Sequence, residues 1–293
     1  MARIDLHIHS TYSDGILSPA AIVDLAKQTG VGAIALTDHD TVAGIAEALV
    51  RGRQVGVTVI AGIEISAWHK DIPLHILGYR LRYNEPVLHH RLLPLQEGRQ
   101  IRNERIVANL NQLGVDLNMA ELSACSQHGQ VGRPHIARLL VQKGVVVSED
   151  EAFNRYLRRG AAAYAERFKY NADEAIAMIW DAGGVAVLAH PGNLESTSVS
   201  IPGLLKELQH LGLLGVEVYH PTHSLPTIRK LKRLAAQLDL LITGGSDFHG
   251  NDRSKAPLGG LRGSRVPYHL LEPLMMSEPR IRPGSRDAYY SGS

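Results

Sequence analysis

Short apolar runs alternate with longer stretches of helical periodicity over most of the chain. The short runs end at Gly, Pro or polar residues, which is typical of buried strands. Ser18 is expected to cap the first helix and Gly30 to end it. The predicted strands lie at 3–10, 33–40, 57–67, 74–81, 185–192, 213–223 and 240–250, and the predicted helices at 18–30, 41–56, 171–184, 201–212 and 224–239.

This alternation predicts mainly parallel strands, in an α/β barrel or a doubly wound sheet. The runs at 57–67 and 74–81 are expected to pair as a hairpin. The stretch 84–173 differs, because it is mainly helical and holds no clear buried strand. We therefore predict a barrel made of 1–83 and 174–263, a helical insertion or cap at 84–173, and a C-terminal tail at 264–293, of which 280–293 is expected to be loosely ordered.

Composition narrows the class of protein. A chain of 293 residues with 44% hydrophobic residues suits one α/β barrel, and a net charge of +2 gives no general case for nucleic-acid or membrane binding. The single cysteine, Cys125, cannot form an intramolecular disulfide. No charged and apolar leader precedes Arg3, so we expect a cytoplasmic protein.

Histidine is the unusual feature, with 15 histidines against three phenylalanines. Most of them lie at the ends of predicted strands, and the C-terminal ends of parallel strands are where α/β folds build active sites. We therefore expect these polar side chains to converge on one site. They are His7, His9, Asp38, His39, Glu64, His190, His220, Asp247 and His249.

His7 and His9 point to the same face of a strand, and paired imidazoles form half a metal site. Taken alone, such a pair is explained as often by surface or hydrogen-bonded histidines as by a metal site. Asp14 is either an oxygen ligand or a turn residue. His39 stands between two aspartates, which predicts a carboxylate that fixes the tautomer of a ligating histidine. The alternative is that Asp40 or Thr41 caps the next helix.

Glu64 lies inside an apolar strand, where an inward carboxylate is costly unless it is paired or bound to metal. We favour the inward orientation over a solvent-facing one, because helices cover barrel strands on the outside. His75 repeats this arrangement. His190 has the alternative of capping a Pro-Gly turn, but a cluster of such residues at strand ends favours metal.

Six segments in order resemble the PHP family, named for polymerase and histidinol phosphatase: DLHIHSTYSDG, ALTDHDT, GIEIS, HILGY, LAHPG and GSDFHG. The resemblance covers Arg3 to about Arg262 and implies a distorted (β/α)7 barrel with a trinuclear metal site. Carried over by motif, it implies one metal on His7, His9, Glu64 and Asp247, a second on Glu64, His75 and His190, and a third on Asp14, His39 and His249.

Nitrogen and oxygen ligands without cysteine suit two or three divalent ions, Mn²⁺ first and Zn²⁺ or Fe²⁺ as alternatives. Such a centre predicts phosphoester hydrolysis by a metal-bridged hydroxide. The candidate catalytic residues are Asp247 with His220 or His223, either of which would protonate the leaving oxygen or support a ligand.

In the insertion, Arg133 and His135 are candidate phosphate-binding residues, with a solvated loop and a helix start as the alternative. The helical stretch 97–110 is basic, and we expect an exposed charged face there rather than an RNA site.

The stand-alone branch that the chain resembles includes phosphatases of 3′,5′-bisphosphorylated nucleosides and enzymes that trim short RNA from its 5′ end. We therefore expect a metal-dependent phosphatase that removes the 3′-phosphate from adenosine 3′,5′-bisphosphate or a similar nucleotide. The alternatives are a 5′-3′ exoribonuclease, a histidinol-phosphate phosphatase and a non-catalytic scaffold. We expect a small nucleotide partner, with short RNA as a second, and no DNA, membrane or obligate protein partner.

Overall fold

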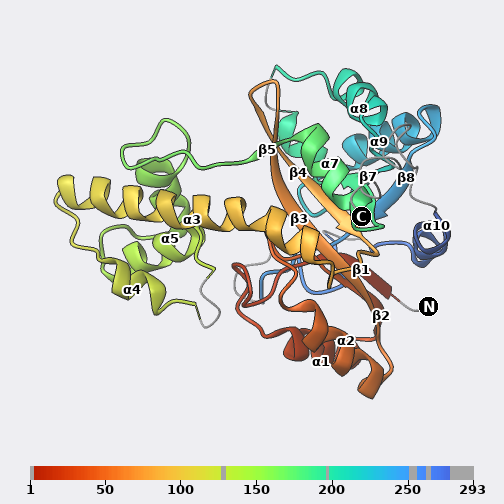
Figure 1. Cartoon of the computed structure of the whole chain (residues 1–293), viewed down its shortest axis with the longest axis horizontal. Coiled ribbons are helices and arrows are strands. Elements are labelled where there is room, and N and C mark those ends of the chain that lie inside the picture. The colour runs from red at the N-terminus through yellow and green to blue at the C-terminus, as the bar shows by residue number, and fades with distance from the viewer. Residues whose placement is uncertain (1–2, 127–129, 196–197, 251–255, 262–264, 278–293) are drawn as a thin grey trace, which may run out of the picture.

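The computed structural model describes residues 3–126, 130–195, 198–250, 256–261 and 265–277 (Figure 1). They form a mixed α/β fold, as predicted from the alternation of strands and helices. Within these ranges every helix is too short or too polar to cross a bilayer.

The central sheet has the strand order β1-β2-β3-β4-β6-β7-β8. The strands are β1 (Arg3–Ile8), β2 (Val31–Leu36), β3 (Thr58–His69), β4 (Ile72–Tyr79), β5 (Tyr170–Asn171), β6 (Val185–Leu188), β7 (Gly215–Tyr219) and β8 (Leu241–Gly244). Neighbours are parallel except at β4, which runs antiparallel to both β3 and β6. The expected hairpin is therefore confirmed.

The two ends of this strand order meet. Beyond β8, Phe248 accepts a backbone hydrogen bond from His9 (2.8 Å) and donates one to the carbonyl of His7 (3.3 Å). The first and last strands of the sheet thus place their polar ends side by side.

Helices cover the sheet: α1 and α2 pack on β2 and β3, α7 packs on β3, β4 and β6, and α9 packs on β7 and β8 (Figure 1). The helices are α1 (Pro19–Thr29), α2 (Ile45–Val55), α3 (Pro86–Gln112), α4 (Met119–Ser123), α5 (Arg133–Gln142), α6 (Glu149–Ala152), α7 (Ala172–Asp181), α8 (Ile201–His210), α9 (Leu225–Gln237) and α10 (Leu271–Met276). A π-helical turn, Phe153–Leu157, follows α6, and 3₁₀ turns occupy Pro191–Leu194 and Tyr268–Leu270.

Local sequence explains where helices begin and end. Ser18 accepts a hydrogen bond from the Ala21 N–H and Gly30 takes a left-handed conformation, as predicted for α1. The helix predicted at 41–56 was wrong at its N-terminal end, because α2 begins at Ile45 after Gly44. Asp40 and Thr41 therefore do not cap it.

The cap has a core of its own. The first half of α3 packs in the main core through Leu88, Leu92 and Leu95, whereas Ile106 and Leu110 belong to a second core. In Figure 1, α3 extends away from the sheet and lies beside α4 and α5. The cap therefore separates within α3 from the sheet and its covering helices, which form the predicted barrel region, and the short β5 is a strand that the sequence did not predict.

The predicted tail is ordered in its described part, 265–277. Val266, Leu270 and Leu274 are buried with Ile4 and Leu6 of β1. The loosely ordered segment expected at 280–293 lies outside the described residues.

Candidate metal centre

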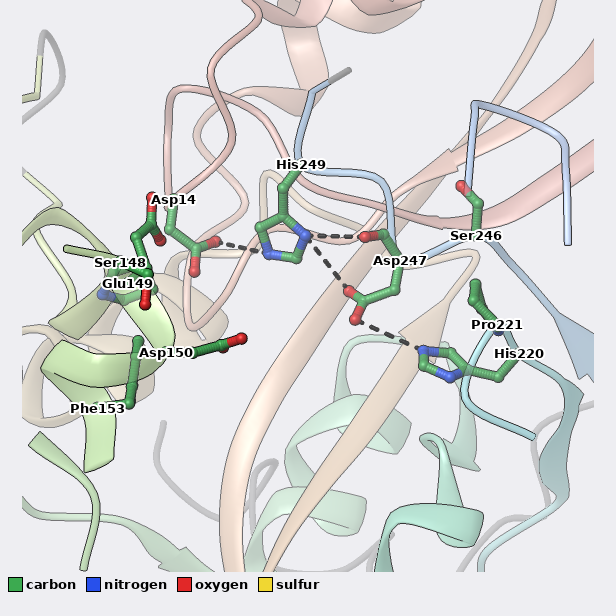
Figure 2. A pocket seen from close by; sticks show the side chains of 11 residues that line it. Asp14, Ser148, Glu149, Asp150, Phe153, His220, Pro221, Ser246, Asp247 and His249 are labelled. Atoms are coloured by element: carbon green, nitrogen blue, oxygen red, sulfur yellow. Dashed lines mark hydrogen bonds and ion pairs between the residues drawn. The ribbon is translucent and has the colours of Figure 1, made fainter. Parts of the chain in front are cut away.

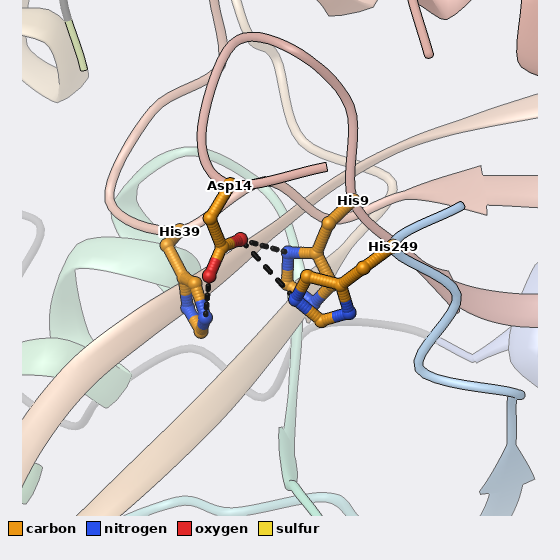
Figure 3. Close-up of side chains that lie close together, drawn as sticks. All are labelled: His9, Asp14, His39 and His249. Atoms are coloured by element: carbon orange, nitrogen blue, oxygen red, sulfur yellow. Dashed lines mark ion pairs between the residues drawn. The ribbon is translucent and has the colours of Figure 1, made fainter. Parts of the chain in front are cut away.

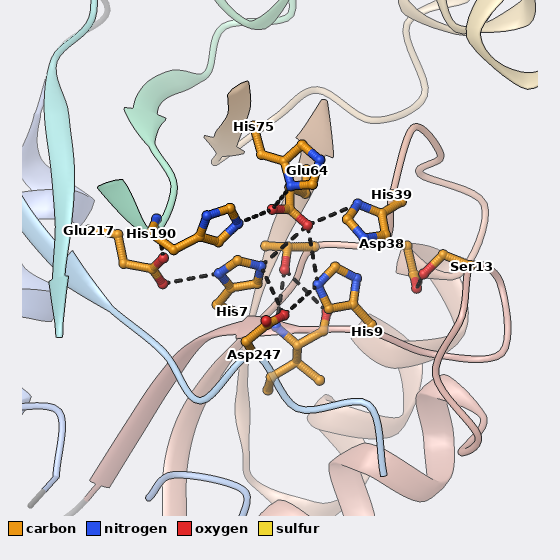
Figure 4. A network of polar contacts seen from close by, with 12 residues as sticks. His7, His9, Ser13, Asp38, His39, Glu64, His75, His190, Glu217 and Asp247 are labelled. Atoms are coloured by element: carbon orange, nitrogen blue, oxygen red, sulfur yellow. Dashed lines mark hydrogen bonds and ion pairs between the residues drawn. The ribbon is translucent and has the colours of Figure 1, made fainter. Parts of the chain in front are cut away.

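Two histidines of the first strand meet a glutamate of the third. The Nε2 atoms of His7 and His9 lie 3.4 and 3.3 Å from Glu64 Oε2 (Figure 4). His7 and His9 are fully buried and Glu64 is 1% exposed. The inward orientation of Glu64 and the shared face of the two histidines are thus both confirmed.

The other oxygen of Glu64 faces two more histidines. His75 Nδ1 lies 2.8 Å and His190 Nε2 3.0 Å from Glu64 Oε1. His75 reaches this point because β4 runs back along β3, and His190 because it follows β6. His39 Nδ1 adds a contact of 2.9 Å to Oε2, so five imidazoles surround one carboxylate.

A second carboxylate, Asp14, organises the neighbouring group (Figure 3). Asp14 Oδ1 lies 3.2 Å from His249 Nε2 and 3.9 Å from His9 Nδ1, and Oδ2 lies 3.9 Å from His39 Nε2. His9 therefore stands between this group and Glu64, with one ring nitrogen directed at each.

Asp247 completes the cluster from the loop after β8. Its Oδ1 lies 3.2 Å from His9 Nε2 and 3.5 Å from His7 Nε2, and its Oδ2 lies 3.5 Å from His220 Nε2 (Figure 2). All nine side chains predicted to bind metal are thus gathered in one place. His220, for which the sequence suggested an acid–base or supporting part, also has metal-ligand geometry with His7 and Asp247.

The donor atoms fit divalent cations. Several are buried without a hydrogen-bond partner, which is costly for polar atoms unless another group binds them. These atoms are His7 Nε2, both ring nitrogens of His9, His39 Nδ1, Glu64 Oε2 and His220 Nε2. Imidazoles and carboxylates without a thiolate form a donor set for Mn²⁺, Zn²⁺ or Fe²⁺.

Charge states also suit metal binding. Burial lowers the pKa of His9 to about 3 and that of His75 to about 4, so both rings are neutral ligands at pH 7. Burial would raise the pKa of Glu64, but His39, His75 and His7 hold it well below its usual range. Against the effect of burial, Asp14 and Asp247 raise the pKa of His249 to about 9. A metal must therefore displace a proton from His249.

Glu217 of β7 supports two of these ligands and was not predicted to do so. It accepts hydrogen bonds from His7 Nδ1 (3.0 Å) and from the backbone N–H of His190 (2.8 Å). The first contact turns His7 Nε2 toward Glu64. Against the effect of burial, Glu217 and Glu64 raise the pKa of His7 well above its usual value, so a metal at Nε2 would have to displace a proton. The available signal was the one used for Glu64: a glutamate within an apolar strand.

His223 has a different part from the one expected. Its Nδ1 donates to the Val218 carbonyl (2.9 Å) and its Nε2 accepts from the Gly192 N–H (3.0 Å). Both ring nitrogens are held by backbone, so the structure does not support acid–base catalysis by His223. It instead fastens the loop that carries His220.

A cavity of about 610 Å³ lies over the cluster, between barrel and cap (Figure 2). Asp14, Asp247, His249 and His220 line its floor, and Pro134, Ser148, Glu149, Asp150 and Phe153 line the cap side. Neither of the predicted phosphate-binding residues, Arg133 and His135, lines this cavity, although Pro134 between them does. Arg133 donates to the Leu157 carbonyl, and His135 Nδ1 accepts from the Gly132 N–H.

The expectation of an exposed charged face at 97–110 was wrong in part. Arg99 binds Asp40, and Arg102 is 4% exposed with a buried Nε that has no hydrogen-bond partner. Arg167, from the returning chain, also binds Asp40. These arginines gather where the cap meets the rest of the fold.

Comparison with known proteins identifies relatives over most of the chain. The profile of the PHP domain matches residues 5–179. A 3′,5′-nucleoside bisphosphate phosphatase of Chromobacterium violaceum is 34% identical over 250 residues, which is 85% of this chain and 88% of the relative. A 5′-3′ exoribonuclease of Haemophilus influenzae is 36% identical over 247 residues, 84% of this chain and 90% of the relative.

A solved structure agrees with these matches. The crystal structure of a proposed metal-dependent phosphoesterase from Bifidobacterium adolescentis superposes with a TM-score of 0.85 at 30% identity, covering 94% of this chain and 96% of that one. The likeness therefore includes the cap as well as the barrel.

Proposed function

The chain belongs to the PHP domain family and has the site of a metal-dependent phosphoesterase, and we propose a specific reaction for it. The protein removes the 3′-phosphate from nucleoside 3′,5′-bisphosphates, such as adenosine 3′,5′-bisphosphate, and gives the 5′-monophosphate. The observation that carries this proposal is the cluster of imidazoles and carboxylates beneath the 610 Å³ cavity, in which donor atoms of His7, His9 and Glu64 are buried without a hydrogen-bond partner.

Two or three divalent ions, Mn²⁺ first, would be held by three overlapping groups. The first is His7, His9, Glu64 and Asp247, the second Glu64, His75 and His190, and the third Asp14, His39 and His249. Bound there, such ions supply Lewis-acid charge to the phosphate oxygens and lower the pKa of the attacking water.

His220 is the side chain that we assign to the leaving oxygen. It lines the cavity beside Asp247, and its Nε2 is buried without a hydrogen-bond partner. Its Nδ1 accepts a hydrogen bond from the Thr222 N–H (3.2 Å), which leaves the proton of the neutral ring on Nε2. This contact holds the ring with Nε2 3.5 Å from Asp247 Oδ2, beside the cavity floor, where it can give a proton to the 3′-oxygen.

The arginines at the junction of cap and barrel would bind the second phosphate of the substrate, the 5′-phosphate. Arg99, Arg102 and Arg167 gather near a single carboxylate, Asp40, which leaves excess positive charge. Burial and the neighbouring Arg99 also lower the pKa of Arg133, and we include Arg133 in the same proposed cationic group. A 5′-phosphate would supply the missing anion.

Phosphate release tests the proposal. Metal-free protein reconstituted with Mn²⁺ is assayed with adenosine 3′,5′-bisphosphate, histidinol phosphate and a short 5′-phosphorylated RNA. Rapid release from the bisphosphate, with the 5′-monophosphate as product, is expected, and Asp247→Ala should abolish it. Metal binding without release from any substrate would refute the proposal and favour a scaffold.

A 5′-3′ exoribonuclease is the second candidate, and it is favoured by the 36% identity to the Haemophilus influenzae enzyme of that name. In the same assay, RNA as the better substrate would promote it. That activity should fall steeply with salt, because contacts to several backbone phosphates release counterions.

A further inference from the structure

A buried carboxylate beside the metal centre holds the loop that carries Asp14. Asp38 follows β2 and is 2% exposed. Its Oδ1 accepts from the Ser10 N–H (2.7 Å) and the Ser13 hydroxyl (2.6 Å), and its Oδ2 accepts from the Ser10 hydroxyl (2.6 Å) (Figure 4).

The loop itself is tight. The Ser13 and Gly15 N–H groups both donate to the Ser10 carbonyl (3.0 Å each). A Cβ at Gly15 would lie 2.2 Å from the His9 carbonyl oxygen, so the turn has no room for a side chain there. Ser13 Oγ lies 3.4 Å from Asp14 Oδ1. The hydrogen bonds between this loop and Asp38 therefore fix the position of Asp14.

The burial of Asp38 is unfavourable in free energy, so packing alone does not explain this residue. Burying a carboxylate costs several kcal/mol unless it is well hydrogen-bonded, and burial raises the pKa of Asp38 despite its serine partners. Its hydrogen bonds go to Ser10 and Ser13 rather than to the neighbouring His39 ring, so the tautomer-fixing role expected from sequence is not the one seen.

We propose that Asp38 is a positioning residue, which sets Asp14 at the distance from His9, His39 and His249 that a metal site needs. The inference rests on the proposed metal-dependent function. Replacing Asp38 would free the loop and weaken this group of ligands, while His7, Glu64 and Asp247 keep their places.

The chain offers a matched control at Asp5, which is equally buried. Asp5 accepts hydrogen bonds from the Ser246 N–H (2.9 Å), the Ser246 hydroxyl and the Gly259 N–H (2.7 Å). It therefore fastens the turn next to Asp247, on the other side of the cluster. Asp5→Asn should leave the Asp14 loop undisturbed.

The test is Mn²⁺ binding, measured as ions per chain by equilibrium dialysis over a range of free Mn²⁺. Asp38→Ala is expected to weaken the binding of one ion at least tenfold, as Asp14→Ala also should, and the double variant should lose no more than Asp14→Ala alone. Asp38→Asn, which keeps one acceptor oxygen, should lose less. Gly15→Ala should reproduce the loss by distorting the same loop.

Amide hydrogen exchange distinguishes the effect of replacing Asp38 from the effect of replacing Asp5. Asp38→Asn should speed exchange at 10–15 and not at 245–249, and Asp5→Asn should do the reverse. If wild type binds Mn²⁺ and both Asp38 variants bind it equally well, or if the double variant loses a further ion, the inference is refuted and the proposed function stands. If wild type binds no Mn²⁺, the proposed function itself fails.

Discussion

Arg99 of the cap binds Asp40 of the barrel through two guanidinium nitrogens, with Nη2 2.7 Å and Nε 3.0 Å from Asp40 Oδ2. Arg167 approaches the same oxygen at 2.9 Å from the returning chain. Burial would raise the pKa of Asp40, but Arg167 and Arg99 hold it well below its usual range. One buried carboxylate therefore joins both connections between cap and barrel.

Asp40→Asn is expected to lower the free energy of unfolding by about 3–5 kcal/mol, because it leaves two largely buried guanidinium groups without their counter-ion. Urea unfolding measures the loss. Asp24→Asn breaks the exposed pair with Arg51 and serves as the control, with a loss below about 1 kcal/mol. Equal losses in the two variants would contradict this account of the junction.

Mn²⁺ should raise the melting temperature of the metal-free protein, since a ligand at 100 times its Kd adds about 2.7 kcal/mol to the native state. Glu64→Gln should remove most of this effect, because Glu64 faces five of the candidate imidazoles. Thermal unfolding with and without Mn²⁺ gives the shift. Glu207→Gln, at an exposed ion pair with Lys70, should keep the shift of wild type. A full shift in Glu64→Gln would be incompatible with the proposed centre.

Without metal, the His249–Asp14 pair should make stability depend on pH. The pKa of His249 is about 9 in the folded chain against an ordinary value of 6.5, so its contribution is fully present below pH 6.5 and is lost as pH rises through 9. The loss amounts to about 3 kcal/mol. Unfolding of metal-free wild type and His249→Gln between pH 6 and pH 9.5 measures it, and the two curves should converge at high pH. A constant gap between them would rule out the raised pKa.

Arg102→Met should separate stability from substrate binding. Removing a buried cation with an unpartnered Nε is expected to leave stability unchanged or to raise it by about 1–4 kcal/mol. The KM for adenosine 3′,5′-bisphosphate should rise about tenfold, since a lost phosphate contact of about 1.4 kcal/mol has that effect. The KM for adenosine 3′-monophosphate should stay constant.

Arg105→Met changes an exposed arginine of the same helix and is the control for both measurements. If Arg102→Met raised KM for both nucleotides alike, Arg102 would not serve the second phosphate.

The candidate metal ligands were accessible to sequence reasoning because each follows or interrupts an apolar strand, where a buried polar side chain is costly unless it is paired or bound to metal. Asp38 and Asp40 were harder, since an aspartate before a helix is also the usual helix cap. The arginines of α3 were misjudged because their spacing matches an exposed charged face. Their burial follows from how α3 crosses from the main core to the cap, which no local pattern encodes.

The route of α3 has a consequence for engineering. The chain leaves the barrel past Arg99 and returns past Arg167, so both guanidinium anchors lie outside the second core, which spans Ile106 to Ala163. We therefore expect that span to be exchangeable. A chimaera that replaces it with a cap of another size should keep both anchors on Asp40 and seat the new cap over the same candidate metal ligands, so that substrate range is redesigned without changing the sheet.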